Sequence, residues 1–263
     1  AKRRDFYEEE ERRRETGHKY VNTGGKKMEN LKPEKILTAK ELASYFDHTL
    51  LRANATVSEF KKLCDDSKRY GFCMVAINPA PVKLCKTFLA GSHVHVGAAI
   101  AFPLGQTTLE DKLSETRNAI KNGADEIDYV VNLTKLKAGD TAYIESEMAR
   151  ITDICREFSV VSKVIFENCY LTEDEKKTLC HIAAKVKPDF IKTSTGFGTG
   201  GATLEDVALM KKETEGSGVK IKAAGGIRTL KTALEMINLG VSRIGSTSSV
   251  AIMEEYMANS PLL

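Results

Sequence analysis

The 263-residue sequence has no run of about 18 uncharged apolar residues, the length that a membrane-spanning helix needs. Its basic first residues are not followed by an apolar segment, so we expect no secretory signal. It also lacks the strong biases of fibrous or disordered chains, since 42% of its residues are apolar and 29% are charged. These absences exclude the collagen-like, disordered and membrane classes. We expect a globular protein with a cytoplasmic location and no membrane partner.

Closely spaced cysteine pairs are also absent. The six cysteines stand at positions 64, 73, 85, 155, 169 and 180, and no two of them form a C-x-x-C motif. Four-ligand zinc sites usually contain such a pair, so we expect buried or free thiols in a reducing compartment. His93 and His95 form an H-x-H motif on an expected strand, where both rings would share one face. This motif could bind a metal, but no third ligand is recognisable, so we expect no metal.

Charge is unevenly distributed along the chain. The formal net charge is +3, and residues 1–27 carry all of it, with nine Lys or Arg against six Asp or Glu. The chain from Met28 onward is neutral and has no bulk electrostatic attraction to nucleic acid, so we expect no nucleic-acid partner. Residues 1–27 have few apolar residues and no lasting period, which predicts a disordered charged extension or leader. The folded domain is placed at residues 28–263.

From residue 38 onward, short β-rich apolar runs alternate with helix-length segments. The expected strands are Phe46–Leu51, Phe72–Asn78, Val94–Ala101, Glu126–Asn132, Lys163–Phe166, Phe190–Thr193, Val219–Ala223 and Arg243–Gly245. Three of the intervening segments begin with an S/T-x-x-E capping box and a fourth with a weaker version, at Thr56, Thr107, Thr172 and Thr203. Eight such units in a chain of about this length predict an α/β fold, a closed (β/α)8 TIM barrel. The alternative, an open doubly wound sheet, usually shows a G-x-G-x-x-G motif after its first strand, and residues 47–51 contain no glycine.

Charged residues occupy inward positions of three expected strands. Alternation along the sixth and seventh runs directs Lys192 and Lys222 into the barrel, and alternation along the fourth directs Asp128 inward. A buried lysine is unfavourable unless it is paired or functional. Because each cation disfavours the charge of the other, we expect one lysine to have a lowered pKa and to form a Schiff base with a carbonyl substrate. The alternative is a buried Lys–Asp ion pair with a second lysine that reaches the rim.

Glycines cluster after the sixth, seventh and eighth runs. Barrels often bind phosphate with backbone N–H groups of the loops after strands seven and eight and of a helix N-terminus. Gly225-Gly226 follows the seventh run, Gly245-Ser246-Thr247-Ser248 follows the eighth, and Gly196 opens a loop after the sixth, so we expect these loops to form such a pocket. Arg228 is a further candidate for a phosphate or carboxylate contact, and the alternative is that it caps the following helix.

Four motifs stand in order between about residues 38 and 257. They are Asp47-His48-Thr49-Leu50-Leu51, Glu126-Ile127-Asp128, Lys192-Thr193-Ser194-Thr195-Gly196 continuing to Thr203, and Lys222-Ala223-Ala224-Gly225-Gly226-Ile227-Arg228-Thr229. Together they resemble the deoxyribose-phosphate aldolase family. The resemblance implies a class I aldolase without cofactor that reversibly cleaves 2-deoxy-D-ribose 5-phosphate to acetaldehyde and glyceraldehyde 3-phosphate. It further implies a role in deoxynucleoside breakdown, and relatives are often homodimers.

The resemblance also implies roles for single residues. Lys192 would be the Schiff-base lysine, and Asp128 and Lys222 would be the proton donor and acceptor pair. Asp47 and Thr195 would contact the sugar hydroxyls. The glycines named above and Ser248 would line the phosphate pocket.

One residue departs from the family pattern, because some relatives place a lysine where this chain has Phe197. Phosphate binding must then rely more on backbone amides. Two other functions remain open: a Schiff-base barrel aldolase for another phosphorylated sugar, or a binding protein recruited to nucleic acid by its basic extension. A binding protein would have no use for two inward lysines.

Overall fold

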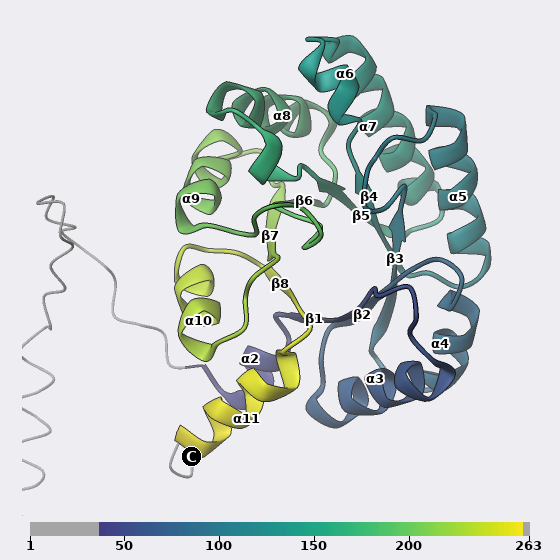
Figure 1. The fold of residues 1–263 in the computed structure, drawn as a ribbon, viewed down its shortest axis with the longest axis vertical. Helices are drawn as coiled ribbons and strands as arrows, with labels where there is room; N and C mark the ends of the chain where they lie inside the picture. The colour runs from purple at the N-terminus through teal and green to yellow at the C-terminus, as the bar shows by residue number, and fades with distance from the viewer. Residues whose placement is uncertain (1–36, 260–263) are drawn as a thin grey trace, which may run out of the picture. The chain divides into compact units, whose positions relative to one another are not determined.

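The computed structural model describes residues 37–259, in which eight parallel strands close into a barrel with helices outside it (Figure 1). The strands are β1 (Phe46–Leu50), β2 (Met74–Ile77), β3 (His95–Ile100), β4 (Glu126–Val130), β5 (Val161–Ile165), β6 (Phe190–Lys192), β7 (Lys220–Ala224) and β8 (Arg243–Ser246). Each strand pairs with the next, and β8 pairs with β1. The predicted (β/α)8 barrel is confirmed.

Helices precede β1, connect successive strands and follow β8, and they lie outside the barrel (Figure 1). They are α2 (Ala39–Ala43), α3 (Val57–Tyr70), α4 (Val82–Phe88), α5 (Leu109–Lys121), α6 (Leu133–Lys137), α7 (Thr141–Glu157), α8 (Glu173–Val186), α9 (Leu204–Glu213), α10 (Leu230–Asn238) and α11 (Ser249–Asn259), with a short 3-10 helix η1 (Asn168–Tyr170). None of the helices within residues 37–259 is long and apolar enough to cross a membrane.

The helix starts follow the capping residues that the sequence marks. Thr56 and Thr172 form the predicted capping boxes at α3 and α8. The third box is wrong by one residue, because Thr108 caps α5 and its hydroxyl accepts a hydrogen bond from the N–H of Asp111 at 3.2 Å. Thr203 caps α9 through its hydroxyl, as expected.

The two faces of the strands carry different side chains. Ile191 and Ile221 belong to the apolar core between the sheet and the helices. Lys192 and Lys222 face the other way, since both contact Asp128 on β4 across the interior of the barrel. The predicted alternation on β6 and β7 is therefore correct, and it places charge inside the barrel.

The remaining structural expectations have mixed outcomes. The six cysteines all fall within residues 37–259 and are free thiols, four of them buried. The extension at residues 1–27 lies outside the described residues. It stays a prediction, as does the start of the domain at Met28.

Candidate active site

Lys192 and Lys222 are direct neighbours on β6 and β7, where they are paired in register. Both amines donate to the same oxygen of Asp128, with Nζ–Oδ2 distances of 2.8 Å from Lys192 and 2.7 Å from Lys222. All three side chains are buried. The structure therefore brings together the three residues predicted to carry the chemistry.

The surroundings of Lys192 lower the pKa of its amine. Burial lowers its pKa from 10.5 to about 8, and the charges of Lys222 and Lys163 act in the same direction, while the Asp128 carboxylate opposes them. At pH 7 about a tenth of such an amine is neutral and nucleophilic. The sequence predicts the lowered pKa from the neighbouring cation alone, whereas burial is the larger cause.

Asp128 carries a stable negative charge between the lysines. Burial would raise the pKa of its carboxyl, but the ammonium groups of Lys163, Lys192 and Lys222 outweigh burial and hold that pKa well below its usual range. A carboxylate in contact with two amines can accept a proton from one and return it to the other.

Lys163 on β5 is a third interior lysine that the sequence reasoning missed. Its Nζ lies 2.7 Å from Asp128 Oδ1 and also pairs with Glu126. Burial works against its charge, but the carboxylates of Asp128 and Glu126 raise its pKa, so it stays protonated. Lys163 stands opposite Asp128 in the sheet, and alternation counted from Val161 would have found it.

A cavity of about 280 Å³ opens at the carboxyl ends of the strands, where the active sites of such barrels lie. The predicted residues that line it are Lys192, Thr195, Gly196, Gly225, Gly226, Arg228 and Gly245. Its lining residues that were not predicted include Thr49, Arg52, Phe197 and Thr247. Lys192 is therefore the catalytic candidate that faces the cavity. Asp128 and Lys222 do not line the cavity, and Asp128 contacts the amines of both lysines inside the barrel.

Asp47 and Ser248 do not line this cavity. The Asp47 carboxylate is buried against Lys222, with an Nζ–Oδ2 distance of 2.6 Å, and it also pairs with Arg243 on β8. The N–H of Ser248 donates to the hydroxyl of Ser246 at 2.9 Å. The predicted contacts of Asp47 with the sugar and of Ser248 with phosphate remain predictions.

Thr195 is fixed by a carboxylate that the sequence reasoning did not anticipate. Glu167, which follows β5 with a left-handed φ of 56°, accepts the N–H of Thr195 at 3.0 Å and also its hydroxyl proton. The N–H of Phe197 donates to the Thr195 hydroxyl at 3.0 Å. Glu167 thus shapes the loop that follows Lys192. Its role depends on backbone geometry that its sequence position does not reveal.

The glycines after β6 and β7 permit two loops to touch through their backbones. A Cβ atom on Gly201 would lie 2.2 Å from the carbonyl oxygen of Gly225, which no side chain could tolerate. Gly225 itself has a left-handed φ of 83°. The N–H of Ala202 donates to that same carbonyl at 3.0 Å. The glycine cluster therefore forms one wall of the cavity.

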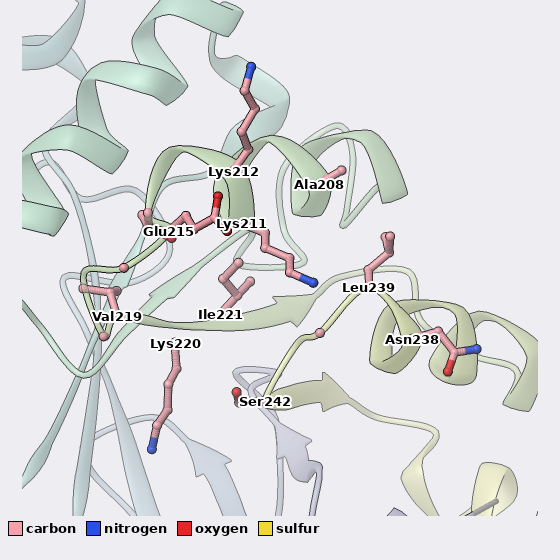
Figure 2. A pocket seen from close by; sticks show the side chains of 14 residues that line it. Ala208, Lys211, Lys212, Glu215, Val219, Lys220, Ile221, Asn238, Leu239 and Ser242 are labelled. Atoms are coloured by element: carbon pink, nitrogen blue, oxygen red, sulfur yellow. The ribbon is translucent and has the colours of Figure 1, made fainter. Parts of the chain in front are cut away.

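A larger cavity of about 790 Å³ lies at the opposite end of β7 and β8, between the C-terminal ends of α9 and α10 (Figure 2). Its charged lining includes Lys211, Lys212 and Lys220. Lys211 and Lys212 stand in the last turn of α9, where cations interact favourably with the helix dipole, and Lys220 is the first residue of β7. Asp128, Lys192 and Lys222 do not line this cavity, and its size does not make it the active site.

The H-x-H motif does not form a two-histidine site. β3 begins at His95, so His93 precedes the strand, and the expectation that both stand on it is wrong. His95 Nδ1 lies 2.7 Å from Glu126 Oε1. Within residues 37–259, no group of three or more His, Cys, Asp and Glu side chains could hold a metal ion.

Comparison with known proteins identifies the family. A family model described as DeoC/LacD family aldolase matches residues 41–246, which include every strand and all of the cavity's lining residues except Thr247. The chain belongs to the DeoC/LacD family of aldolases. It is therefore an enzyme, an aldehyde-lyase that acts on a carbon–carbon bond, and the inward lysine pair lies in the barrel of an aldolase.

The relatives of this DeoC/LacD aldolase cover most of its length. The deoxyribose-phosphate aldolase of Lactobacillus acidophilus is 55% identical over 217 residues, which are 82% of this chain and 91% of the relative. That of Bacteroides thetaiotaomicron is 50% identical over 220 residues, which are 84% of this chain and 92% of the relative.

Solved structures give the same fold. The deoxyribose phosphate aldolase from Aeropyrum pernix, described as tetrameric, has a TM-score of 0.79 and 28% identity over 85% of this chain and 94% of its own. The structure of QR15, an aldolase, has a TM-score of 0.78 and 38% identity over 83% of this chain and 96% of its own.

Proposed function

We propose that this aldolase reversibly cleaves 2-deoxy-D-ribose 5-phosphate to acetaldehyde and D-glyceraldehyde 3-phosphate through a Schiff base on Lys192. The observation that carries the proposal is the position of this amine at the cavity, with a pKa of about 8 and a carboxylate 2.8 Å away. The names of the relatives at 55% and 50% identity supply the substrate.

The proposed reaction begins on the neutral amine of Lys192. Its lone pair attacks C1 of the open-chain sugar, and the resulting carbinolamine loses water to give an iminium ion. The C3 hydroxyl then loses its proton, the C2–C3 bond breaks, and its electron pair moves toward the iminium to form an enamine. Glyceraldehyde 3-phosphate leaves. Protonation of the enamine at C2 and addition of water release acetaldehyde and restore the amine.

Asp128 and Lys222 transfer protons in these steps. The shared oxygen Oδ2 of Asp128 lies 2.8 Å from the amine of Lys192 and 2.7 Å from that of Lys222, so a proton can pass between the three groups without rearrangement. The iminium supplies the electrophilic activation that a metal ion would otherwise provide, so the proposed reaction requires no metal or cofactor.

The phosphate of the substrate is proposed to bind at the glycine-rich end of the cavity. Gly225 and Gly226 follow β7, and Gly245 at the end of β8 leads toward the N-terminus of α11. Backbone N–H groups at such a place attract anions. Arg228 adds a positive charge beside them.

The wider biological setting belongs to the same proposal. We place the reaction in deoxynucleoside breakdown in the cytoplasm, with the enzyme as a homo-oligomer. The Aeropyrum pernix relative is described as a tetramer. The homodimer expected from the sequence stays a prediction.

Borohydride trapping tests the covalent step. Reduction in the presence of acetaldehyde should leave a stable adduct on the peptide that contains Lys192, detected by mass spectrometry, and the Lys192→Ala variant should leave that site unlabelled. An adduct confined to Lys222 or to surface lysines would refute the assignment. Cleavage of other phosphorylated sugars in preference to deoxyribose 5-phosphate would refute the substrate while leaving the Schiff base intact.

A further inference from the structure

The loop after β1 contributes a positive charge to the catalytic cavity. Arg52 lines the cavity together with Arg228 and Lys192, and no Asp or Glu of residues 37–259 lines it. Because β1 pairs with β8, this loop neighbours the loop that follows Gly245. Arg52 therefore stands on the side of the cavity where the phosphate is proposed to bind.

The Arg52 guanidinium is held in place by its neighbours. One terminal nitrogen donates to the backbone carbonyl of Asn54 at 3.2 Å and to its side-chain oxygen at 3.0 Å, and the other pairs with Glu59. Glu59 in turn accepts the N–H of Thr56 at 2.8 Å and closes the capping box of α3. A guanidinium has five N–H donors, and these contacts use at most three. At least two donors remain for a ligand.

The other residues that line the cavity offer the phosphate group no anchored positive charge. Phe197 is 56% exposed and packs edge-on against Phe102 with 5.4 Å between ring centres, so it supplies no cation. The nitrogen of Lys192 is occupied by the substrate once the Schiff base forms. Arg228 is exposed, and its side chain makes no hydrogen bond or salt bridge with another residue of 37–259. Arg52 is thus the anchored one of the two arginines at the cavity.

We propose that Arg52 binds the phosphate group of the substrate and sets the preference of this enzyme for phosphorylated over unphosphorylated sugars. Hydrogen bonds from a guanidinium to a phosphate monoester are charge-assisted and can be bidentate. The tether to Asn54 and Glu59 lowers the ordering cost of this contact. The inference rests on the proposed function, because it assumes that the substrate phosphate lies in this cavity.

The experiment compares deoxyribose 5-phosphate with unphosphorylated 2-deoxyribose. In Arg52→Gln, kcat/KM for deoxyribose 5-phosphate should fall about tenfold, mainly through KM, while cleavage of 2-deoxyribose stays within about twofold of wild type. Inhibition by inorganic phosphate should weaken by a similar factor. Arg52→Lys, which keeps the charge and loses the fork, should lie between wild type and Arg52→Gln.

Two further variants separate binding from loop structure. Glu59→Gln weakens the tether by removing the carboxylate charge but keeps the guanidinium and its contacts with Asn54, so it should affect the phosphorylated substrate less than Arg52→Gln does. Arg117→Gln removes an exposed arginine, paired with Glu157 on the outer helices, and should leave both substrates unchanged.

The outcomes distinguish this inference from the proposed function. Equal losses for both sugars in Arg52→Gln would mean that Arg52 only shapes the loop, which overturns the inference. An unaltered preference for the phosphorylated sugar in that variant would overturn it as well and leave the proposed function standing. A wild-type enzyme without any preference for the phosphorylated sugar would overturn the proposed substrate itself.

Discussion

Two clusters of buried lysine and carboxylate groups occupy different layers of this barrel. Between α5 and α7, Lys112 Nζ lies 2.7 Å from Glu147 Oε1 and donates to the carbonyl of Val130 at 2.8 Å. The second oxygen of Glu147 accepts the N–H of Asn132 at 3.0 Å. Burial lowers the pKa of Lys112 and raises that of Glu147, and one positive charge meets one negative charge. Both side chains of this pair are closed off from solvent, and their charges cancel.

The cluster inside the barrel is open to a cavity, and its charges are not balanced. Three lysines contact the single carboxylate of Asp128, and Lys192 among them faces a cavity. Burial lowers the pKa of a lysine in both clusters. Only Lys192 combines that lowered pKa with surplus positive charge and access for a substrate. A perturbed lysine is therefore a catalytic candidate only where its partners leave it unbalanced and its amine can be reached.

The largest expected effect is on Lys192. Replacement by Ala should reduce cleavage of deoxyribose 5-phosphate by about a thousandfold or more, because no other lysine among residues 37–259 lines the cavity. The fold should persist, since the change removes a surplus cation. An assay of glyceraldehyde 3-phosphate formation, with circular dichroism as the folding control, measures both. Near-normal turnover in Lys192→Ala would show that the interior cluster is no more catalytic than the pair of Lys112 and Glu147.

Lys112→Met should show the opposite pattern. Breaking a buried ion pair leaves an unpaired charge and costs about 3–5 kcal/mol in the free energy of unfolding. Turnover per folded molecule should stay near wild type, because Lys112 does not line the cavity. Denaturant titration and active-site-normalised kinetics measure the two quantities. The double variant Lys112→Met/Glu147→Leu should recover most of the stability.

Two substitutions beside Lys192 should move its titration in opposite directions. The charge of Lys222 lowers the pKa of Lys192 and the charge of Asp128 raises it. Lys222→Leu should therefore shift the acidic limb of the pH–activity profile upward from about 8, and Asp128→Asn should shift it downward. The residual activity of both variants, measured from pH 6 to 10, would show both shifts. Shifts of the same sign would show that charge does not control the amine.

The smallest effect is expected at the exposed edge of the interior cluster. Glu126 raises the pKa of His95 above 6.5, so this contact stabilises the fold fully below pH 6.5 and the contribution is lost as pH rises through the folded-state pKa. Because the His95 side chain is 45% exposed, we expect less than about 1 kcal/mol. His95→Gln should thus lower stability at pH 5 and leave it unchanged at pH 9, as urea unfolding would reveal.

The sequence predicts the barrel and the lysine pair because both depend on period-two alternation within strands. Lys163 was missed because the expected fifth strand began at that residue, although the outward position of Val164 gives it the inward direction. Glu167 and Arg52 could not be predicted, since their roles depend on where loops after β5 and β1 turn in space. His93 was misplaced because the start of β3 depends on pairing with β2.

The interior charges have a consequence for how the molecule assembles. The buried acidic side chains of the strands, Asp47, Glu126 and Asp128, all come from β1 to β4, whereas the buried Lys and Arg side chains, Lys163, Lys192, Lys222 and Arg243, all come from β5 to β8. The salt bridges among them join one half of the barrel to the other. Either half folded alone would have to desolvate charges of a single sign. Closure of the sheet and pairing of its interior charges are therefore coupled, and Lys192 obtains its carboxylate partner only when both halves have docked.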